Sequence, residues 1–443
     1  MELLDSHAHY NDEKFDSDRE KVLNEIYNSG VTTIINAGYS IESSKKAIEI
    51  ANEHEFIYAT VGVSPNDIDN LDAVSGSTKT SNGLKNIVKK QIINLPVYET
   101  GKPIEYVARE FGLDPDGILK MASNENPLGP SPKAVEAVSK HLNGLNYYPD
   151  GGSYDLRMKL SQKLGLKPSQ FAIGNGSNEL LEFVAQCFVG EGDETVFGAQ
   201  SFIVYKLATI FCGGKCVSVP MPNLKYDLDM LRDAVTEKTK IVFMTNPNNP
   251  TGCVVKQDEV VNFVKSLPEN VVFCYDEAYT EFQDDEVDLR PLISEGRNVI
   301  CLRTFSKIYG LAGLRCGYSY SSEELAGYIN RIREPFNVNT LAQVGALAAL
   351  DDAEFVNESR RINNLGRKQF EKAFGELGLE YFSEGGNFVM VKVEDASGKF
   401  VQMQKRGVIV RPNVGYGLPD WLRITIGKPE QNERCIEELK KLL

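Results

Sequence analysis

Histidine is scarce in this chain of 443 residues, which contains His7, His9, His54 and His141 and no others. From residue 84 onward only His141 remains. A Ser-His-Asp hydrolase or a histidine-rich metal site is therefore nearly excluded from that long region. Chemistry there must come from lysine, aspartate, tyrosine, arginine and a cofactor.

Paired cysteines and long apolar runs are also lacking. The eight cysteines are scattered, and the closest two, Cys212 and Cys216, match neither a disulfide framework nor a zinc spacing. No run of 18 apolar residues predicts a membrane span, and the start has no basic and apolar segments of a signal peptide. We expect no bound metal, no membrane association, and a cytoplasmic protein with reduced thiols.

Basic residues are outnumbered by acidic ones, and the net charge is −14. An acidic chain is a poor ligand for nucleic acid, so we expect no nucleic-acid partner. Residues 1–80 carry a net charge of −9 and the remainder −5, so the N-terminal stretch differs in character. With 42% hydrophobic and 25% charged residues, the composition is that of a globular protein of two or three domains.

The N-terminal stretch alternates strand-like and helix-like patterns, which favours parallel βαβ units. The expected elements are a strand from Leu3 to His9, a helix over 18–29, a strand over 31–37, a helix over 41–54 and a strand over 56–63. Residues 75–83 are polar and rich in Gly and Ser, which indicates a linker. A new unit begins near residue 84.

Three continuous apolar runs later in the chain suit buried parallel strands. They are 241–245, 271–275 and 299–302, followed by the polar clusters 246–252, 276–279 and 303–307 respectively. Open α/β sheets bind ligands beyond the carboxyl ends of their strands. The sequence therefore predicts that these three clusters meet at one active site.

The clusters supply what pyridoxal phosphate needs. An amine for its aldehyde is available in Lys307, a carboxylate for its ring nitrogen in Asp276, and an arginine for its phosphate in Arg315. Taken one at a time, each residue also has an ordinary explanation. Lys307 could be a solvated lysine, Asp276 a turn or cap residue, and Arg315 a surface arginine. The segment 174–179 follows a strand-like run and opens an apolar helix, as a phosphate site or a simple N-cap would.

The motifs 246–252 (NPNNPTG), 276–279 (DEAY), 304–307 (TFSK) and 313–317 (GLRCG) together resemble those of fold-type I aminotransferases. The segments 94–98 (NLPVY), 124–127 (NENP), 146–149 (NYYP) and 422–427 (LRITIG) narrow the resemblance to histidinol-phosphate aminotransferases. It covers about residues 84–443. It implies an α/β fold with a large, mostly parallel cofactor domain (about 121–325) and a smaller α/β domain (about 326–443, joined by the arm 84–120).

The resemblance also implies roles for individual residues. Lys307 forms the Schiff base and moves the proton, Asp276 pairs with the pyridine nitrogen, and Tyr279 and Asn249 hydrogen-bond the phenolic oxygen. Phe202 stacks on the ring. Residues expected to hold the cofactor and its phosphate are Ser177, Asn178, Thr304, Ser306, Arg315 and, from the neighbouring subunit of a homodimer, Tyr148.

The implied reaction transfers an amino group between glutamate and imidazole-acetol phosphate, giving 2-oxoglutarate and L-histidinol phosphate, and it runs in both directions. Arg411 and Arg423, otherwise surface ion-pair residues, resemble the pair that binds the substrate's phosphate or carboxylate. Tyr98 and Asn126 would assist. Related enzymes that transaminate aromatic amino acids or decarboxylate threonine phosphate use the same Lys, Asp and Arg set and remain alternatives.

Asp5-Ser6-His7-Ala8-His9, together with 31–39 and 61–67, resembles the start of TatD-type metal-dependent deoxyribonucleases. That family uses the two histidines as metal ligands, which leaves a metal-dependent phosphodiesterase as a second class of function. However, Ser64 stands where the family usually has histidine, and the later ligands are missing. Three strands cannot close a barrel. We therefore expect residues 1–74 to be a truncated fragment without nuclease activity.

Overall fold

The computed structural model describes residues 3–61, 87–93, 95–97 and 101–443. The chain divides into two compact units, Met1–Ile87 and Val88–Leu443. The expected linker 75–83 lies outside the described residues. Within them, no helix is long and apolar enough to cross a membrane.

The N-terminal unit is a three-stranded parallel sheet, as its alternating pattern predicts. Its elements are β1 (Leu3–Ala8), α1 (Arg19–Asn28), β2 (Val31–Ala37), α2 (Ile41–Glu53) and β3 (Ile57–Thr60). The central strand is β2, and a small core forms where Leu23 and Ile50 from the helices meet Ile34 and Ile57 from the sheet. Among the described residues β1 and β3 are the two edge strands, and the three strands form an open sheet.

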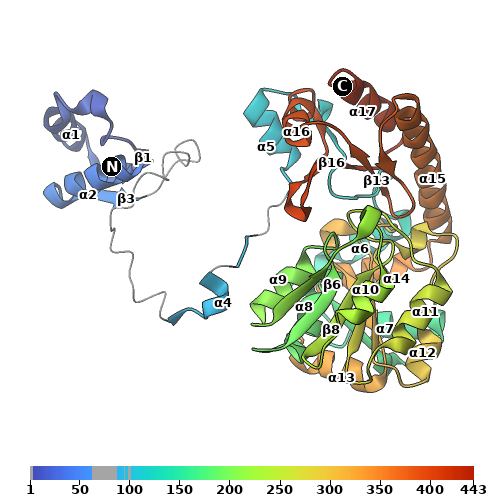
Figure 1. Ribbon diagram of the computed structural model, residues 1–443. Coiled ribbons are helices and arrows are strands. Elements are labelled where there is room, and N and C mark those ends of the chain that lie inside the picture. The colour runs from blue at the N-terminus through green and yellow to red at the C-terminus, as the bar shows by residue number, and fades with distance from the viewer. Residues whose placement is uncertain (1–2, 62–86, 94, 98–100) are drawn as a thin grey trace. The chain divides into compact units, whose positions relative to one another are not determined.

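The second unit is built on a seven-stranded sheet, shown in Figure 1. In spatial order the strands are β5 (Phe171–Gly174), β11 (Gly317–Tyr320), β10 (Val299–Thr304), β9 (Val272–Asp276), β8 (Thr239–Thr245), β6 (Glu194–Gly198) and β7 (Lys215–Val219). All neighbouring pairs are parallel except those made by β11, which is antiparallel to β10 and β5. This mostly parallel sheet confirms the expected fold class.

The three strands expected from the apolar runs lie side by side at the centre of this sheet. In register, Thr245 of β8 and Leu302 of β10 both pair with Asp276 of β9. Their carboxyl ends therefore meet at one edge, and the polar clusters that follow them are brought together as the sequence predicts.

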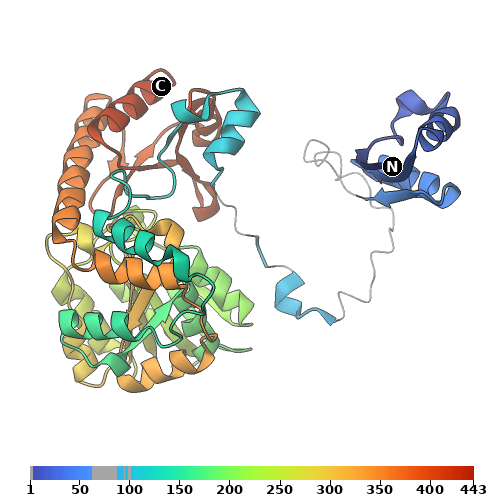
Figure 2. The ribbon, with the colours of Figure 1, turned by 180° about the vertical axis from the view of Figure 1, so that it is seen from behind.

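Helices cover both faces of the large sheet. Successive residues of a strand point to opposite faces, and here both sets are apolar and buried. Val242 and Met244 pack into one core, and Ile241 and Phe243 into another. Among the described residues, six helices cover the first core: α6 (Pro132–His141), α7 (Tyr154–Leu164), α10 (Leu228–Asp233), α11 (Gln257–Ser266), α12 (Arg290–Ser294) and α14 (Thr340–Ala349). Three of the described helices cover the second core: α8 (Ser177–Phe188), α9 (Val204–Phe211) and α13 (Glu323–Ile332). Figure 2 shows α6 and α14 side by side.

A smaller domain packs around a four-stranded antiparallel sheet with its own apolar core. Its elements are β12 (Tyr381–Phe382), β13 (Phe388–Lys392), β16 (Leu418–Thr425), β15 (Arg411–Asn413), α15 (Ala353–Glu376), α16 (Ala396–Lys405) and α17 (Pro429–Lys440). From the arm before the large domain, α5 (Ile104–Phe111) packs on α16, and β4 (Leu119–Lys120) pairs with β14 (Val408–Ile409). The short helix α4 (Lys90–Ile93) contacts α9.

The core of the large sheet continues past the domain boundary that the sequence suggested near residue 325. Val338, Ala342, Ala346 and Leu350 are buried in it. Helix α14 brings them there, because its apolar alanines pack closely against α6.

Candidate active site

A cavity of about 320 Å³ lies at the carboxyl ends of the central strands. Side chains from both domains line it, including Arg411 and Arg423 of the smaller one. Twelve of the residues singled out in the sequence line this cavity: Lys307, Asp276, Tyr279, Asn249, Ser177, Asn178, Phe202, Thr304, Ser306, Arg315, Arg411 and Arg423.

Lys307 follows β10 and is partly buried, and its Nζ donates a hydrogen bond to the carbonyl of Ser123 at 3.1 Å. Burial lowers the pKa of the amine to about 8, and the nearby charge of Arg423 adds to the effect. Both factors disfavour the ammonium form. A lysine with this pKa has a substantial neutral fraction near physiological pH and can act as a nucleophile.

Asp276 ends β9 and is 4% exposed. Burial raises the pKa of its carboxyl group to about 6, although the backbone N–H of Ala278 (3.1 Å) and the hydroxyl of Tyr205 (3.2 Å) both donate to it. A buried carboxylate that is costly to ionise alone is stabilised by a cationic N–H donor. The site thus suits a protonated ring nitrogen.

The amino end of α8 forms a cradle for an anion. No side chain caps this helix in the described part of the chain, and Gly176 precedes it with a φ of 87°. A Cβ on Gly317 would lie 2.5 Å from the backbone nitrogen of Ser177, so glycine lets β11 approach the helix end. The guanidinium of Arg315 donates to Ser306 Oγ at 3.3 Å beside it. Free helix N–H groups, a hydroxyl and an arginine are phosphate ligands.

A buried polar cluster joins the two domains of the second unit. Arg423 on β16 donates to Asn249 Oδ1 at 2.5 Å and to the carbonyl of Ala122 at 2.7 Å. Its Nε is buried without a hydrogen-bond partner among the described residues. The hydroxyl oxygen of Tyr279 accepts from Asn124 Nδ2 at 2.9 Å.

Three expected site residues are not placed in the cavity lining. Asn126 donates to the Ile308 carbonyl (2.8 Å) and to Ser359 Oγ (2.9 Å), so it ties loops together. Tyr148 is 84% exposed. Tyr98 lies outside the described residues.

Sequence reasoning missed two polar residues that shape the site. Asn124 lies in the same NENP segment as Asn126, and that shared motif was the available signal. Tyr205 lies on α9 and is completely buried, yet it donates to Asp276. Its position in an apolar helix is indistinguishable from that of a packing aromatic.

These groups fit the expected cofactor. Pyridoxal phosphate offers an aldehyde, a basic ring nitrogen, a phenolic oxygen and a phosphate. One cavity holds a matching group for each of them. Lys307 supplies an amine of lowered pKa and Asp276 a buried carboxylate. Tyr279 and Asn249 supply a hydroxyl and an amide, and the uncapped end of α8 supplies backbone N–H groups. Gly317 keeps the space beside the backbone nitrogen of Ser177 free, which a Cβ at position 317 would fill.

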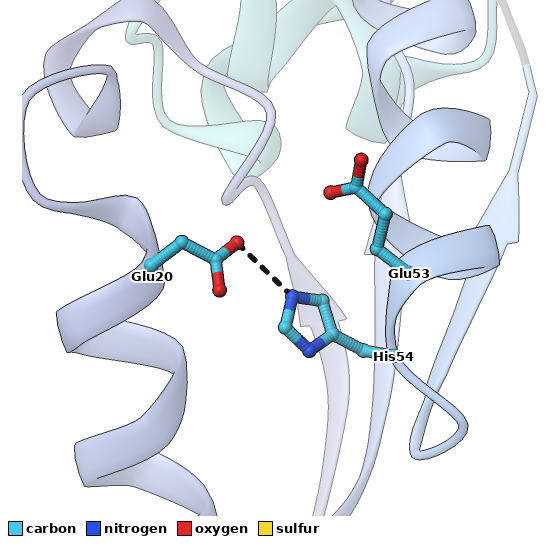
Figure 3. A group of neighbouring side chains, drawn as sticks. All are labelled: Glu20, Glu53 and His54. Atoms are coloured by element: carbon cyan, nitrogen blue, oxygen red, sulfur yellow. Dashed lines mark hydrogen bonds and ion pairs between the residues drawn. The ribbon is translucent and has the colours of Figure 1, made fainter.

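In the N-terminal unit, His9 Nδ1 lies 2.8 Å from the carbonyl oxygen of Ala37. The side chain of His7 and all of Ser64 lie outside what the structure describes. Among the described residues, one group of three could hold a metal ion, namely Glu20, Glu53 and His54 (Figure 3). His54 precedes β3 and so lies at the amino end of the parallel sheet, where it is paired with Glu20 at 3.2 Å.

The sequence matches two family models. Residues 116–439 match "Aminotransferase class I and II", and residues 4–110 match "TatD related DNase". The end of the second match includes α5, whose buried Val107 and Ala108 pack with Ile118 and Ile409 of the second unit. Structurally, that end therefore belongs with the aminotransferase.

The curated relatives and solved structures agree with the first match. A histidinol-phosphate aminotransferase of Akkermansia muciniphila is 45% identical over 361 residues, which is 81% of this chain and 99% of the relative. One of Brevibacillus brevis is 45% identical over 358 residues, covering 80% and 98%.

A histidinol-phosphate aminotransferase of Sinorhizobium meliloti, solved in complex with pyridoxal-5'-phosphate, is similar with a TM-score of 0.73 and 27% identity, covering 84% of this chain and all of that one. An aspartate aminotransferase of Thermus thermophilus shares the fold, with a TM-score of 0.69 and 19% identity over 80% of this chain and 99% of that one. The chain belongs to the class I and II aminotransferases, in the histidinol-phosphate aminotransferase family.

Proposed function

We propose that this enzyme uses pyridoxal phosphate to transfer an amino group from L-histidinol phosphate to 2-oxoglutarate, forming imidazole-acetol phosphate and glutamate. The observation that carries the proposal is the cavity that holds Lys307, Asp276 and two arginines together. The 45% identity to enzymes named for this activity supports it.

Pyridoxal phosphate, when bound, withdraws electrons from the bonds at the substrate's Cα. Lys307 supplies the amine that attaches it, and the same nitrogen then carries the proton that leaves Cα. Its lowered pKa suits both tasks, because the neutral amine accepts a proton near physiological pH.

Asp276, Tyr279 and Asn249 orient the cofactor in this proposal. The Asp276 carboxylate would hold the ring nitrogen protonated, and Tyr205 keeps that carboxylate in place by donating a hydrogen bond to it. The hydroxyl of Tyr279 and the amide of Asn249 face the same cavity, where they would donate to the phenolic oxygen. Phe202 lines the cavity and packs edge-on against Tyr205 with ring centroids 6.0 Å apart, which suits a ring-stacking role.

The substrate's phosphate and the second substrate's carboxylate require an anion site, which we assign to Arg411 and Arg423. Both line the cavity from the smaller domain, on neighbouring strands where they pair in register. Two planar guanidinium groups suit phosphate and carboxylate alike. Asn126 acts indirectly, by holding the loop that carries Asn124 and Glu125.

We also propose a homodimer with shared active sites, in which Tyr148 reaches the cofactor phosphate of the neighbouring subunit. Tyr148 stacks on Phe336 with centroids 4.9 Å apart. Both rings of this pair are exposed, and so are Leu142, Leu145, Tyr147 and Tyr154, which lie near Tyr148 in the sequence. Exposed apolar side chains that gather in one place mark interfaces between proteins.

A cytoplasmic location belongs to the same proposal. The eight cysteines are free, and five of them are buried. Unpaired thiols are typical of reducing compartments.

The proposal is tested with the purified full-length protein and Lys307→Ala as the matched control. We expect an absorbance band near the visible–ultraviolet boundary that shifts on addition of L-histidinol phosphate. Glutamate should form once 2-oxoglutarate is supplied, and the control should make none. A yellow protein that ignores histidinol phosphate would refute the substrate. Turnover of an aromatic amino acid, or CO₂ release from threonine phosphate, would establish an alternative instead.

A further inference from the structure

The side chain of Asn124 is held in one orientation deep in the cavity wall. Asn124 and Tyr279 are 1% and 3% exposed. The backbone N–H of Asn124 donates to Thr425 Oγ1 at 2.9 Å, so the threonine hydroxyl has its own proton to give, and it donates to Asn124 Oδ1 at 3.3 Å. With its oxygen occupied in this way, the amide presents its NH₂ group to Tyr279.

The backbone at Asn124 is equally constrained. Its φ of 55° lies in the left-handed region, which asparagine tolerates better than most residues. Asn387 Nδ2 donates to its carbonyl at 2.9 Å. Left-handed backbone at a non-glycine residue, held in place by hydrogen bonds, occurs often at ligand-binding and active sites.

The direction of the bond to Tyr279 has a chemical consequence. An amide NH₂ can only donate, so the tyrosine oxygen is the acceptor at 2.9 Å. A phenolic hydroxyl proton stays near the ring plane and has two favoured positions, and an incoming donor occupies one of them. The proton of Tyr279 is therefore directed to the other side.

We infer that Asn124 is a positioning residue, which turns the hydroxyl proton of Tyr279 toward the phenolic oxygen of the bound cofactor. This inference rests on the proposed function, because it concerns how the chain prepares its donor for pyridoxal phosphate. The tyrosine retains that proton under working conditions, since burial raises its pKa to about 12.

The test is a pH titration of the visible absorbance of the cofactor-loaded protein, which does not depend on turnover. Its midpoint reports loss of the proton shared between the lysine nitrogen and the phenolic oxygen. A donor to that oxygen stabilises the negative charge left behind and so lowers the midpoint. Losing the donor raises it, by about one pH unit for one charge-assisted hydrogen bond.

Two variants probe Asn124, each alone and combined with Tyr279→Phe. Asn124→Gly keeps the left-handed backbone and removes the amide. Asn124→Asp keeps the shape but accepts the tyrosine proton instead of donating, and it serves if the glycine variant fails to load. Each single variant should raise the midpoint as Tyr279→Phe does. In the Tyr279→Phe background, Asn124→Gly should add no further shift.

The outcomes separate the inference from the function. If the wild type loads the cofactor and Asn124→Gly has the same midpoint as the wild type, the inference is overturned and the proposed function stands. Shifts that add fully in the double variant would overturn it too, since Asn124 would then act without Tyr279. A wild type that takes up no cofactor would refute the proposed function and the inference with it.

Discussion

The hydroxyl of Tyr205 donates a hydrogen bond to Asp276 Oδ2 at 3.2 Å, which links a helix on one face of the sheet to the carboxylate at its centre. The tyrosine ring stacks on Phe243 with centroids 4.8 Å apart, so it cannot easily turn away. Replacing Tyr205 by Phe keeps the packing and removes the bond. We expect cofactor affinity to fall about tenfold, the equivalent of one such bond to a charged group. Fluorescence titration of the apoprotein with pyridoxal phosphate measures it.

Tyr328→Phe is the matched control for this substitution. Its hydroxyl donates to Glu324 on the exposed side of α13, so affinity should not change. Equal affinities for wild type and Tyr205→Phe would show that Tyr205 does not support Asp276.

Gly317→Ala should disrupt the phosphate cradle. The added Cβ would lie 2.5 Å from the nitrogen of Ser177 and 2.7 Å from the carbonyl carbon of Gly176, and neither backbone atom can move without shifting α8. Overpacking of this kind costs about 1–3 kcal/mol, so we expect cofactor binding to weaken by about fivefold to a hundredfold. Gly313→Ala, where a Cβ meets nothing within 4 Å, is the control. Identical cofactor affinities for both variants would contradict the assignment of the cradle.

Lys307→Met should make the apoprotein more stable near pH 7. Burial lowers the pKa of the lysine from 10.5 to about 8, so below pH 8 the folded protein carries a penalised ammonium that the variant lacks. The gain is at most about 3 kcal/mol. Between pH 8 and 10.5 the unfolded chain binds this proton more strongly than the folded one, so wild-type stability should rise with pH in that window.

Urea denaturation of the two apoproteins across pH 7–10.5 checks both expectations. The stability difference should narrow as the pH rises, because the wild-type lysine loses its charge. A difference that stays constant with pH would mean that the pKa of Lys307 is not lowered.

Mixing two inactive variants tests the shared active site of the proposed dimer. Lys307→Ala lacks the amine, and Tyr148→Ala would lack the residue contributed to the partner. A mixed dimer combines both defects in one site and leaves the other intact. With random pairing, about a quarter of wild-type activity should return. Activity that stays at the level of the separate variants would exclude this arrangement.

Removing residues 1–87 should leave a folded aminotransferase. The second unit, Val88–Leu443, has its own apolar cores, and α4, α5 and β4 of the arm pack within it. Circular dichroism and glutamate formation by the shortened chain measure this. A chain that unfolds or loses its activity would show that the N-terminal unit is required.

The chemistry-bearing residues could be predicted from the sequence because they are adjacent to strong local signals. Lys307 and Asp276 each follow an apolar run, and parallel strands place their carboxyl ends at one edge. The same local patterns predicted the three strands and two helices of the N-terminal unit. Their bounds shifted by only a few residues, and the end of the last expected strand lies outside the described residues.

Other features were decided only by the tertiary structure. Asn126 and Asn124 stand two residues apart in one motif, yet of these two only Asn124 lines the cavity. The amide of Asn124 donates to Tyr279, whereas that of Asn126 donates to the Ile308 carbonyl. Tyr205 reaches Asp276 from 71 residues away. The bond between Arg423 and Asn249 spans 174 residues and joins the two domains of the enzyme. Such contacts depend on how separate elements pack, and no pattern of neighbouring residues encodes that packing.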